Sequence, residues 1–290
     1  MSEVIIKAEN LTYTYSEGLP GAFTALKDVS LEIGRGEFVG VIGHTGSGKS
    51  TLIQHFNGLL KPTSGKVYVD GQDLWADKTL LRSFRFRVGL VFQYPEYQLF
   101  EETVEKDISF GPKNMGLSDE ETDERVRDAL RFVGLSESVL ALSPFDLSGG
   151  QKRRVAIAGV LAMDPEVLIL DEPAAGLDPG GRAEILGQIK SYHKARGNTV
   201  IIVSHSMEDI AKYASRVLVI KDGEVYAYGG VKEIFRMSDE LETMGLSIPI
   251  VTKIMLELKR RGYAVDSSVF TVKSAVESLL PLLGKGGEKC

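Results

Sequence analysis

The chain has 290 residues, of which 43% are apolar and 26% are charged, the balance of an ordinary globular protein. Its net charge of −6 at pH 7 creates no field that would attract nucleic acid, and we expect no nucleic-acid partner. Cys290 is the only cysteine, which excludes an intrachain disulfide, and no apolar run approaches the roughly 18 residues of a membrane span. Another polypeptide would have to supply any pathway through a membrane.

Short apolar runs predict a parallel sheet that is buried on both faces. The runs alternate with helical segments, which is typical of the α/β class, and each leads into a turn with polar or glycine residues. The runs are Glu37–Ile42, Arg87–Phe92, Val167–Leu170 and Thr199–Val203. In this class the functional residues gather at the carboxyl ends of the strands. Val4–Thr12, Leu31–Ile33 and Lys66–Val69 indicate a smaller, largely antiparallel N-terminal sheet.

Two helical regions accompany this core. From about residue 94 to 163 the pattern turns helical and charged, and Ser118 with Glu121 has the spacing of a helix capping box. We interpret this region as a helical subdomain inserted in a core that spans residues 1–230. Residues 231–290 carry two amphipathic helical stripes and predict a small helical extension, packed on the core or on another copy.

The segment Gly43–Thr51 (GHTGSGKST) predicts a phosphate-binding loop, because it follows an apolar strand and opens a helix. Its glycines let backbone N–H groups turn toward phosphate oxygens, and the helix N-terminus adds a positive dipole. Lys49 would reach the β- and γ-phosphates of ATP, and the Ser50 hydroxyl would bind Mg²⁺. The residues expected to bind nucleotide here are Gly43, His44, Thr45, Gly46, Ser47, Gly48, Lys49, Ser50 and Thr51.

The segment Val167–Glu172 (VLILDE) supplies the complementary carboxylates. Asp171, at the end of a buried strand, would hold Mg²⁺, and Glu172 would orient or deprotonate the attacking water. An isolated Asp-Glu pair after a strand is more often a helix cap or a solvated turn. Downstream of a phosphate loop, the functional interpretation is favoured.

The segment Leu147–Gln151 (LSGGQ) stands at a predicted helix start, a position that faces anions. Since the chain already has one phosphate loop, we expect this second cradle to serve the ATP of another subunit. The residues expected to contact that nucleotide are Ser148, Gly149, Gly150 and Gln151. The alternative is a helix cap followed by a solvated basic turn.

With these motifs in this order, residues 4–230 resemble the nucleotide-binding subunit of an ATP-binding cassette (ABC) transporter. The resemblance implies that Gln93 links Mg²⁺ and water to the membrane-subunit contact, and that His205 touches the γ-phosphate. It also implies that Asp178 lies in a loop through which paired subunits sense each other. Tyr15 would stack on adenine, with Tyr13 as the rival, and core packing of two alternating tyrosines is the less favoured alternative.

A narrower likeness lies in Phe92–Gly116, Ala175–Pro179 and the C-terminal extension, which are similar to the ATPases of energy-coupling factor transporters. That family takes up vitamins and transition-metal ions such as cobalt and nickel. The resemblance implies two ATPase subunits, identical or closely related, that dimerise on ATP. They would engage a transmembrane coupling protein joined to a substrate-binding membrane protein, and the chain would lie peripherally on the cytoplasmic face of the membrane.

The same likeness implies a groove for a coupling helix, with interior packing of the helical subdomain as the alternative. The groove residues are Tyr94, Tyr97, Leu99 and Phe100.

Two other functions share the ATP motifs: the ATPase of a conventional ABC importer or exporter, and a soluble ABC ATPase acting on chromosomes, DNA repair or ribosomes. The stretch from Ser50 to Leu147 is too short for the long coiled coil of the repair and chromosome proteins. Many translation-factor types carry two cassettes, whereas this sequence shows one. Ala174 and Lys152 depart from the common family pattern, but neither change removes a phosphate or metal ligand.

Overall fold

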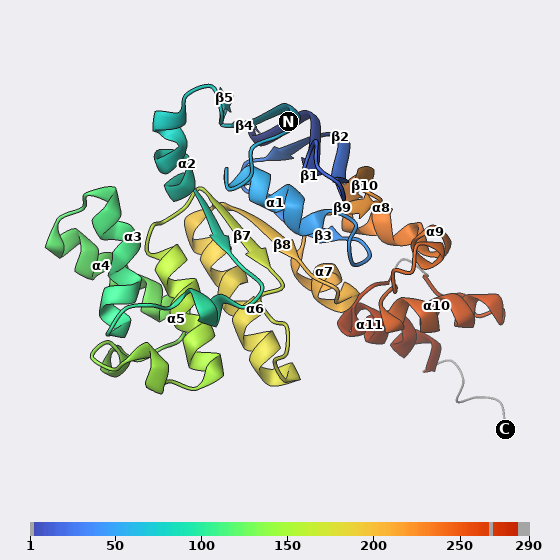
Figure 1. The fold of residues 1–290 in the computed structure, drawn as a ribbon. Helices are drawn as coiled ribbons and strands as arrows, with labels where there is room; N and C mark the ends of the chain where they lie inside the picture. Colours follow the sequence, from blue (N-terminus) through green and yellow to red (C-terminus); the bar gives the residue numbers. More distant parts are fainter. Residues whose placement is uncertain (1–2, 267–268, 284–290) are drawn as a thin grey trace.

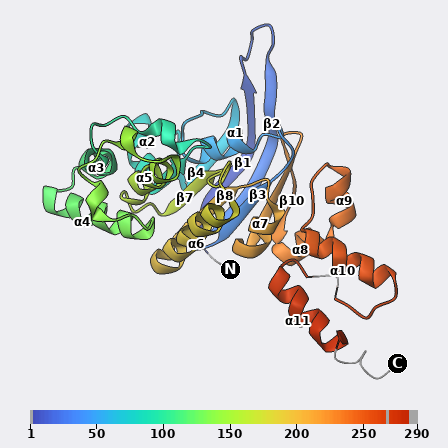
Figure 2. The same cartoon turned by 90° about the horizontal axis from the view of Figure 1, so that it is seen from below.

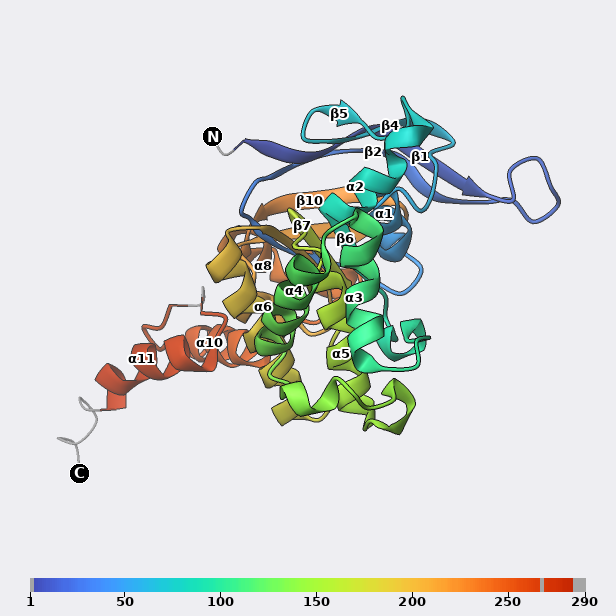
Figure 3. The ribbon, with the colours of Figure 1, turned by 90° about the vertical axis from the view of Figure 1, so that its left-hand side faces the viewer.

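The computed structural model describes residues 3–266 and 269–283, whose strands form two sheets (Figure 1). The smaller sheet is antiparallel, in the order β2-β1-β4-β5. Its strands are β1 (Val4–Tyr15), β2 (Phe23–Gly34), β4 (Ser64–Val69) and β5 (Gln72–Asp73). The β1–β2 hairpin projects beyond the rest of the molecule (Figures 2 and 3).

The larger sheet has the order β10-β9-β3-β8-β7-β6, with β10 antiparallel at one edge and the other strands parallel. Its strands are β3 (Phe38–Ile42), β6 (Val88–Val91), β7 (Val167–Asp171), β8 (Thr199–Val203), β9 (Arg216–Lys221) and β10 (Glu224–Gly230). Successive side chains of β3 enter different apolar clusters, Phe38 on one face and Val39 on the other. This burial on both faces explains the uninterrupted apolar runs in the sequence.

Different layers cover the two faces of the parallel sheet. One face packs on α1 (Lys49–Phe56) and the antiparallel sheet. The other packs on α5 (Gly149–Leu161), α6 (Pro179–Arg196) and α7 (Met207–Tyr213). The short helix α2 (Leu81–Arg87) leads into the edge strand β6.

Helices α3 (Val104–Met115), α4 (Asp119–Phe132) and α5 follow β6 in the chain and form a block beside the parallel sheet (Figures 1 and 3). The helix α4 begins at the predicted capping box. The Ser118 hydroxyl accepts from the Glu121 N–H at 3.2 Å, and the Glu121 carboxylate accepts from the Ser118 N–H at 2.9 Å.

In the described residues beyond β10 the chain forms the helices α8 (Val231–Arg236), α9 (Ser238–Thr243), α10 (Ile250–Arg260) and α11 (Val272–Leu283). They pack on the core through Phe235 and Phe270, whose rings are 5.5 Å apart, and α10 and α11 share a small apolar cluster around Met255. The predicted stripe on α10 is only partly buried, because this cluster is too small to cover Ile250 and Ile254. The domain division at residue 230, where β10 ends, and the subdomain limits near 94 and 163 stay predictions.

A ring of ion pairs joins the antiparallel sheet to the parallel sheet. Arg35, after β2, lies 2.7 Å from Asp70 and 2.9 Å from Glu166. Arg87, at the end of α2, lies 2.9 Å from Asp70 and also pairs with Glu166. Because each charge has two partners, the ring restrains the two sheets more than isolated surface pairs would.

We predict that Glu166→Gln lowers the free energy of unfolding by roughly 1 kcal/mol at neutral pH, because both arginines lose a charged partner. Hydrogen bonding from Arg87 lowers the pKa of Glu166, so this stabilisation is present above the ordinary pKa of a glutamate and lost as pH falls through the lowered value. Urea unfolding at several pH values measures it. Glu102→Gln, which removes an exposed pair with Lys106 at the start of α3, is the control, and an equal loss there would contradict the prediction.

Candidate active site

The parallel sheet brings the predicted site residues to one edge. Val203 of β8 pairs with Val41 of β3 on one side and with Asp171 of β7 on the other. Val91 of β6 pairs with Leu170, so the four strands end at about the same level. The residues that follow these ends include Gly43, Gln93, Glu172 and His205.

The phosphate loop is shaped by close backbone contacts. A Cβ at Gly43 would lie 2.3 Å from a backbone carbonyl oxygen of β9, so no larger residue fits there. The Gly223 N–H, in the turn between β9 and β10, donates to the Ser47 carbonyl at 3.0 Å and supports the loop from behind. Thr45 and Gly46 are exposed, which leaves the tip of the loop open to a ligand.

The Lys49 ammonium is held inside this loop. It donates to the carbonyl oxygens of Gly43 at 2.8 Å and His44 at 2.9 Å, and the side chain is buried. Burial lowers the pKa of Lys49, while the charges of Glu172 and Asp171 oppose that shift. The positive charge is therefore fixed where the loop amides converge, next to two carboxyl groups.

The two adjacent carboxyl groups occupy different environments. Burial raises the pKa of Asp171, and a hydrogen bond from Ser50 and the charge of Lys49 oppose this. Burial raises the pKa of Glu172 to about 7, helped by the charge of Asp171 and opposed by Lys49. Glu172 can therefore gain or lose a proton near neutral pH.

The backbone holds Glu172 in an uncommon conformation. Its φ of 52° lies in the left-handed region, and its N–H donates to the Val203 carbonyl at 3.1 Å. His205 Nε2 lies 3.3 Å from Glu172 Oε1 but not in hydrogen-bond geometry, and among the described residues this buried oxygen has no hydrogen-bond partner. Strained backbone and an unpaired buried oxygen are typical of a site built for a ligand rather than for stability.

The Ser148 segment begins α5 with a capping box. The Ser148 hydroxyl accepts from the Gln151 N–H at 3.3 Å, and Gln151 Oε1 accepts from the Ser148 N–H at 3.1 Å. A Cβ at Gly149 or Gly150 would meet no atom within 4 Å, so open space lies in front of the helix start. The helix α5 belongs to the helical block, whereas α1 lies beneath the antiparallel sheet, and the two are apart in Figures 1 and 3.

The two candidate adenine-stacking tyrosines differ in exposure. The Tyr15 ring is 39% exposed, and its hydroxyl lies 3.1 Å from Thr51 Oγ1 on α1. Tyr13 is partly buried and packs against the core, with its ring edge-on to the His55 ring at a centroid distance of 4.8 Å. The geometry favours Tyr15 over Tyr13 as a platform for a base, and the assignment stays a prediction.

Gln93 and Asp178 lie at the surface. Gln93 is exposed shortly after β6, at the same sheet edge as Asp171. Asp178 caps α6 by accepting the Gly181 N–H at 2.9 Å, so it has a local structural task besides any contact with a partner.

Comparison with known proteins assigns the family. The ABC transporter family model matches residues 26–175. The energy-coupling factor transporter ATP-binding protein EcfA2 of Clostridium tetani is 55% identical over 98% of this chain and 99% of its own length. Its counterpart in Caldanaerobacter subterraneus is 55% identical over 96% of this chain and 97% of its own length. The chain belongs to the ABC transporter family.

Solved structures of ABC proteins agree with this assignment. The structure of cbiO1 from Clostridium perfringens, part of the ABC transporter complex cbiONQ, has a TM-score of 0.75 and 41% identity, covering 90% of this chain and 98% of that one. The dimeric post-hydrolysis state of the ATP-binding cassette MJ0796, bound to ADP and phosphate, has a TM-score of 0.69 and 33% identity, covering 78% and 99%. The predicted P-loop α/β fold, the ABC ATPase activity and the likeness to energy-coupling factor ATP-binding proteins are confirmed.

Some residues at this ABC ATPase site are not evident from the sequence. Asp222, in the β9–β10 turn, pairs with His44 of the phosphate loop at 3.3 Å. Arg153 and Arg154, which follow LSGGQ, do not form a solvated basic turn. Arg153 is buried, and Arg154 makes two bonds to Glu184 of α6. The consecutive basic residues are visible in the sequence, but their acidic partners cannot be identified there because they are far away along the chain.

We predict that ATP hydrolysis by the chain rises with pH through about 7, because a Glu172 that takes a proton from water must first be ionised. Below that value, kcat at saturating ATP should fall by about tenfold per pH unit. Steady-state rates from about pH 5.5 to about pH 8.5 at constant ionic strength measure this. Glu172→Gln should hydrolyse ATP slowly and lack the rise in rate with pH. A wild-type rate that is constant across this pH range would contradict the prediction.

Proposed function

We propose that the chain is one of two ATPase subunits that close around ATP and power uptake of a small substrate through an energy-coupling factor type membrane complex. The observation that carries the proposal is the separation of the two phosphate-facing elements. The loop around Lys49 and the helix start at Ser148 lie on different blocks of one chain, and open space faces Gly149. The dimeric state of the similar MJ0796 cassette supports pairing.

In this proposal, ATP lies between two chains. One chain contributes the residues from Gly43 to Thr51, with Tyr15 against adenine and Lys49 on the β- and γ-phosphates. The partner subunit covers the γ-phosphate with its own LSGGQ segment, and its Asp178 loop meets the first chain. Because the nucleotide bridges the two subunits, its hydrolysis releases them.

The residues near Lys49 fit a Mg²⁺ ion that accompanies the nucleotide. The Ser50 hydroxyl and the Asp171 carboxyl are hydrogen-bonded to each other and offer hard oxygen ligands, which Mg²⁺ prefers. Gln93 at the same sheet edge adds an amide oxygen. No group of three or more His, Cys, Asp or Glu side chains suited to a metal occurs in the described part of the chain, as expected where phosphates and water complete the shell. When bound, Mg²⁺ would neutralise charge on the phosphates.

The chain's own groups carry out the proton transfer and position the phosphates. Water attacks the γ-phosphorus, the bond from phosphorus to the bridging oxygen of ADP breaks, and the proton of the water passes to a Glu172 carboxylate oxygen. Lys49 and the loop amides hold the phosphates in line for this attack. Burial and the charge of Lys49 lower the pKa of His205, so its neutral imidazole can hydrogen-bond the γ-phosphate.

The membrane-facing part of the proposal rests on the energy-coupling factor relatives. None of the helices in the described part of the chain has the length and apolar content needed to cross a bilayer. A transmembrane coupling protein and a substrate-binding membrane protein would provide the pathway, with the chain on the cytoplasmic face and a vitamin or transition-metal ion as cargo. The net charge of −6 offers no support for a nucleic-acid partner.

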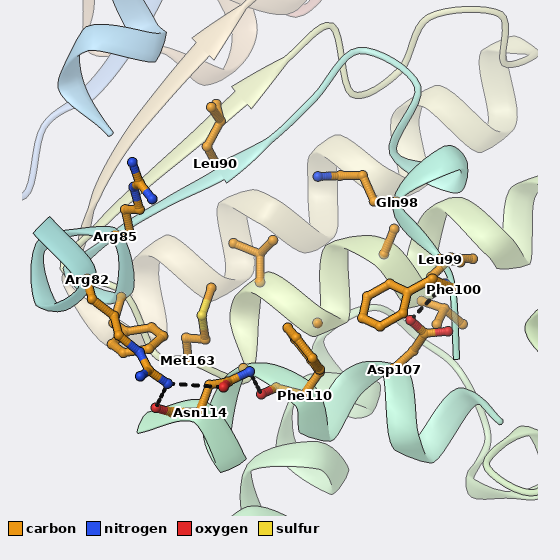
Figure 4. A pocket seen from close by; sticks show the side chains of 16 residues that line it. Arg82, Arg85, Leu90, Gln98, Leu99, Phe100, Asp107, Phe110, Asn114 and Met163 are labelled. Atoms are coloured by element: carbon orange, nitrogen blue, oxygen red, sulfur yellow. Dashed lines mark hydrogen bonds between the residues drawn. The ribbon is translucent and has the colours of Figure 1, made fainter. Parts of the chain in front are cut away.

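A cavity of about 410 Å³ beside the Gln93 segment fits a coupling helix (Figure 4). Leu99 and Phe100 line it, and the Phe100 ring packs edge-on against Phe110 at 5.0 Å. Tyr97 is 85% exposed and Phe100 59% exposed, so interior packing does not account for them. Leu99 is buried and does pack internally. Exposed aromatic rings around a hollow are typical of a groove that receives an apolar helix.

We predict that Glu172→Gln binds ATP, hydrolyses it roughly 10²- to 10⁴-fold more slowly, and accumulates as an ATP-held dimer. Light scattering coupled to size exclusion, with and without ATP, measures the mass. Lys49→Ala should lose most of its ATP affinity and stay monomeric. Near-normal turnover in Glu172→Gln would remove that residue from the catalytic role.

We predict that Tyr97→Ala combined with Phe100→Ala leaves the fold intact but breaks co-purification with the coupling protein from detergent-solubilised membranes. The cause is loss of Phe100, an exposed ring that lines the cavity, and of Tyr97, an exposed ring in the segment beside it. Tyr263→Ala, at an exposed aromatic of the C-terminal helices, is the matched control. Recovery of the complete complex with the double variant would refute the groove.

A further inference from the structure

Arg153 is a buried cation one helical turn beyond the start of α5. It is only 5% exposed, although Lys152 and Arg154 beside it are not buried. Its guanidinium donates to both carboxylate oxygens of Glu96, at 3.2 and 3.3 Å, and to the carbonyl oxygens of Pro173 at 3.4 Å and Ala175 at 2.5 Å. A buried arginine with several directed hydrogen bonds fixes the relative orientation of the segments it joins.

Each of the three joined segments contains or adjoins residues to which the proposed function gives a role. The helix α5 carries Ser148 at its start. Glu96 lies in the short 3₁₀ helix η2 (Pro95–Gln98), between Gln93 and the exposed Tyr97. Pro173 and Ala175 lie in the loop that runs from Glu172 to Asp178.

The other contacts of α5 are less directional. Val155, Ile157 and Leu161 bury apolar surface, which stabilises the helix without defining its rotation closely. Arg154 ties α5 to Glu184 on α6, well past the Asp178 loop. Among the described contacts of α5, Arg153 alone therefore connects the LSGGQ helix to both the catalytic loop and the groove segment through charged hydrogen bonds.

We infer that Arg153 is a positioning residue that couples the membrane-subunit groove to closure of the ATP site. The inference rests on the proposed function. Through Glu96, a helix seated in the groove shifts the guanidinium, and through Pro173 and Ala175 the guanidinium orients the loop between Glu172 and Asp178. Since coupling is reciprocal, closure on ATP also reorients the groove segment. Arg153 touches neither the nucleotide nor the attacking water.

The test compares four full-length variants: Arg153→Met, Arg153→Lys, Glu96→Gln and, as the matched control in the same helical turn, Arg154→Met. For each, we would measure the unfolding midpoint, the Kd for a fluorescent ATP analogue, and kcat and KM for ATP. The measurements use the purified chain and the detergent-solubilised membrane complex. The Kd measures binding of the analogue to the chain's own phosphate loop, which Arg153 does not contact.

We expect Arg153→Met to bind the analogue within about twofold of wild type while kcat falls roughly 10- to 100-fold, as misplacement of catalytic groups from a distance does. Arg153→Lys should recover the unfolding midpoint but not kcat, because an ammonium cannot reproduce the fork to Glu96 and the carbonyls. Glu96→Gln should keep the kcat of the isolated chain within about twofold, because the bonds from Arg153 to the two carbonyl oxygens remain. The same variant should lose stimulation by the membrane subunits, because the charged link to η2 is removed.

The inference is overturned if Arg153→Met turns over like wild type, if Arg153→Lys restores full kcat, or if Arg154→Met shows the same losses. If Arg153→Met does not fold, the kcat of Arg153→Lys decides the matter in the same way. Failure of the proposed function looks different, because the wild-type chain itself would then neither pair on ATP nor respond to the membrane subunits.

Discussion

The charge balance at the carboxyl edge of the parallel sheet is the constraint on which the site depends. Asp171 is buried and the adjacent Glu172 is partly buried. Burial raises the pKa of both carboxyl groups, and the charge of Asp171 raises that of Glu172 further. The Lys49 ammonium, held by two loop carbonyls, opposes both effects. Burial is the largest cause of the raised pKa of Glu172, which is about 7, so this carboxyl group can accept a proton near neutral pH.

The same fold leaves the site incomplete within one chain. The phosphate loop is open at Thr45 and Gly46, and the glycines after Ser148 face empty space on a separate block. A triphosphate that must be contacted from two sides therefore needs a second subunit. In the proposed function the γ-phosphate bridges the two subunits, so hydrolysis, which removes this phosphate from the nucleotide, weakens the contact between them.

Polar contacts define how the blocks of the molecule sit on one another. Apolar clusters hold the antiparallel sheet and the helical block against the parallel sheet, but such packing is non-directional. The ring of Arg35, Asp70, Arg87 and Glu166 orients the first, and the hydrogen bonds from Arg153 to carbonyl oxygens in the loop after β7 orient the second. A small number of charged groups thus lie between the nucleotide-binding edge of the sheet and the surface that we propose as the contact with a membrane partner.

Much of the site could be predicted from the sequence because its chemistry is local. Gly43–Thr51 and Val167–Glu172 each place strand, turn and functional residues in a continuous segment, and the structure puts them at one sheet edge. The helix start at Ser118 follows from a pair only three positions apart. The exposure of Ile250 and Ile254 on α10 could not be predicted, because a helical pattern does not state how large a neighbouring apolar cluster is.

The sequence by itself determined the phosphate loop, the carboxylate pair, the LSGGQ helix start and the P-loop α/β class, since neighbouring residues define strand–loop–helix geometry. Only the tertiary structure decided the pKa of Glu172, the greater exposure of Tyr15 than of Tyr13, and the burial of Arg153. Arg153 meets Glu96 across 57 positions of the chain, and burial depends on what the fold packs around a group rather than on its neighbours in sequence.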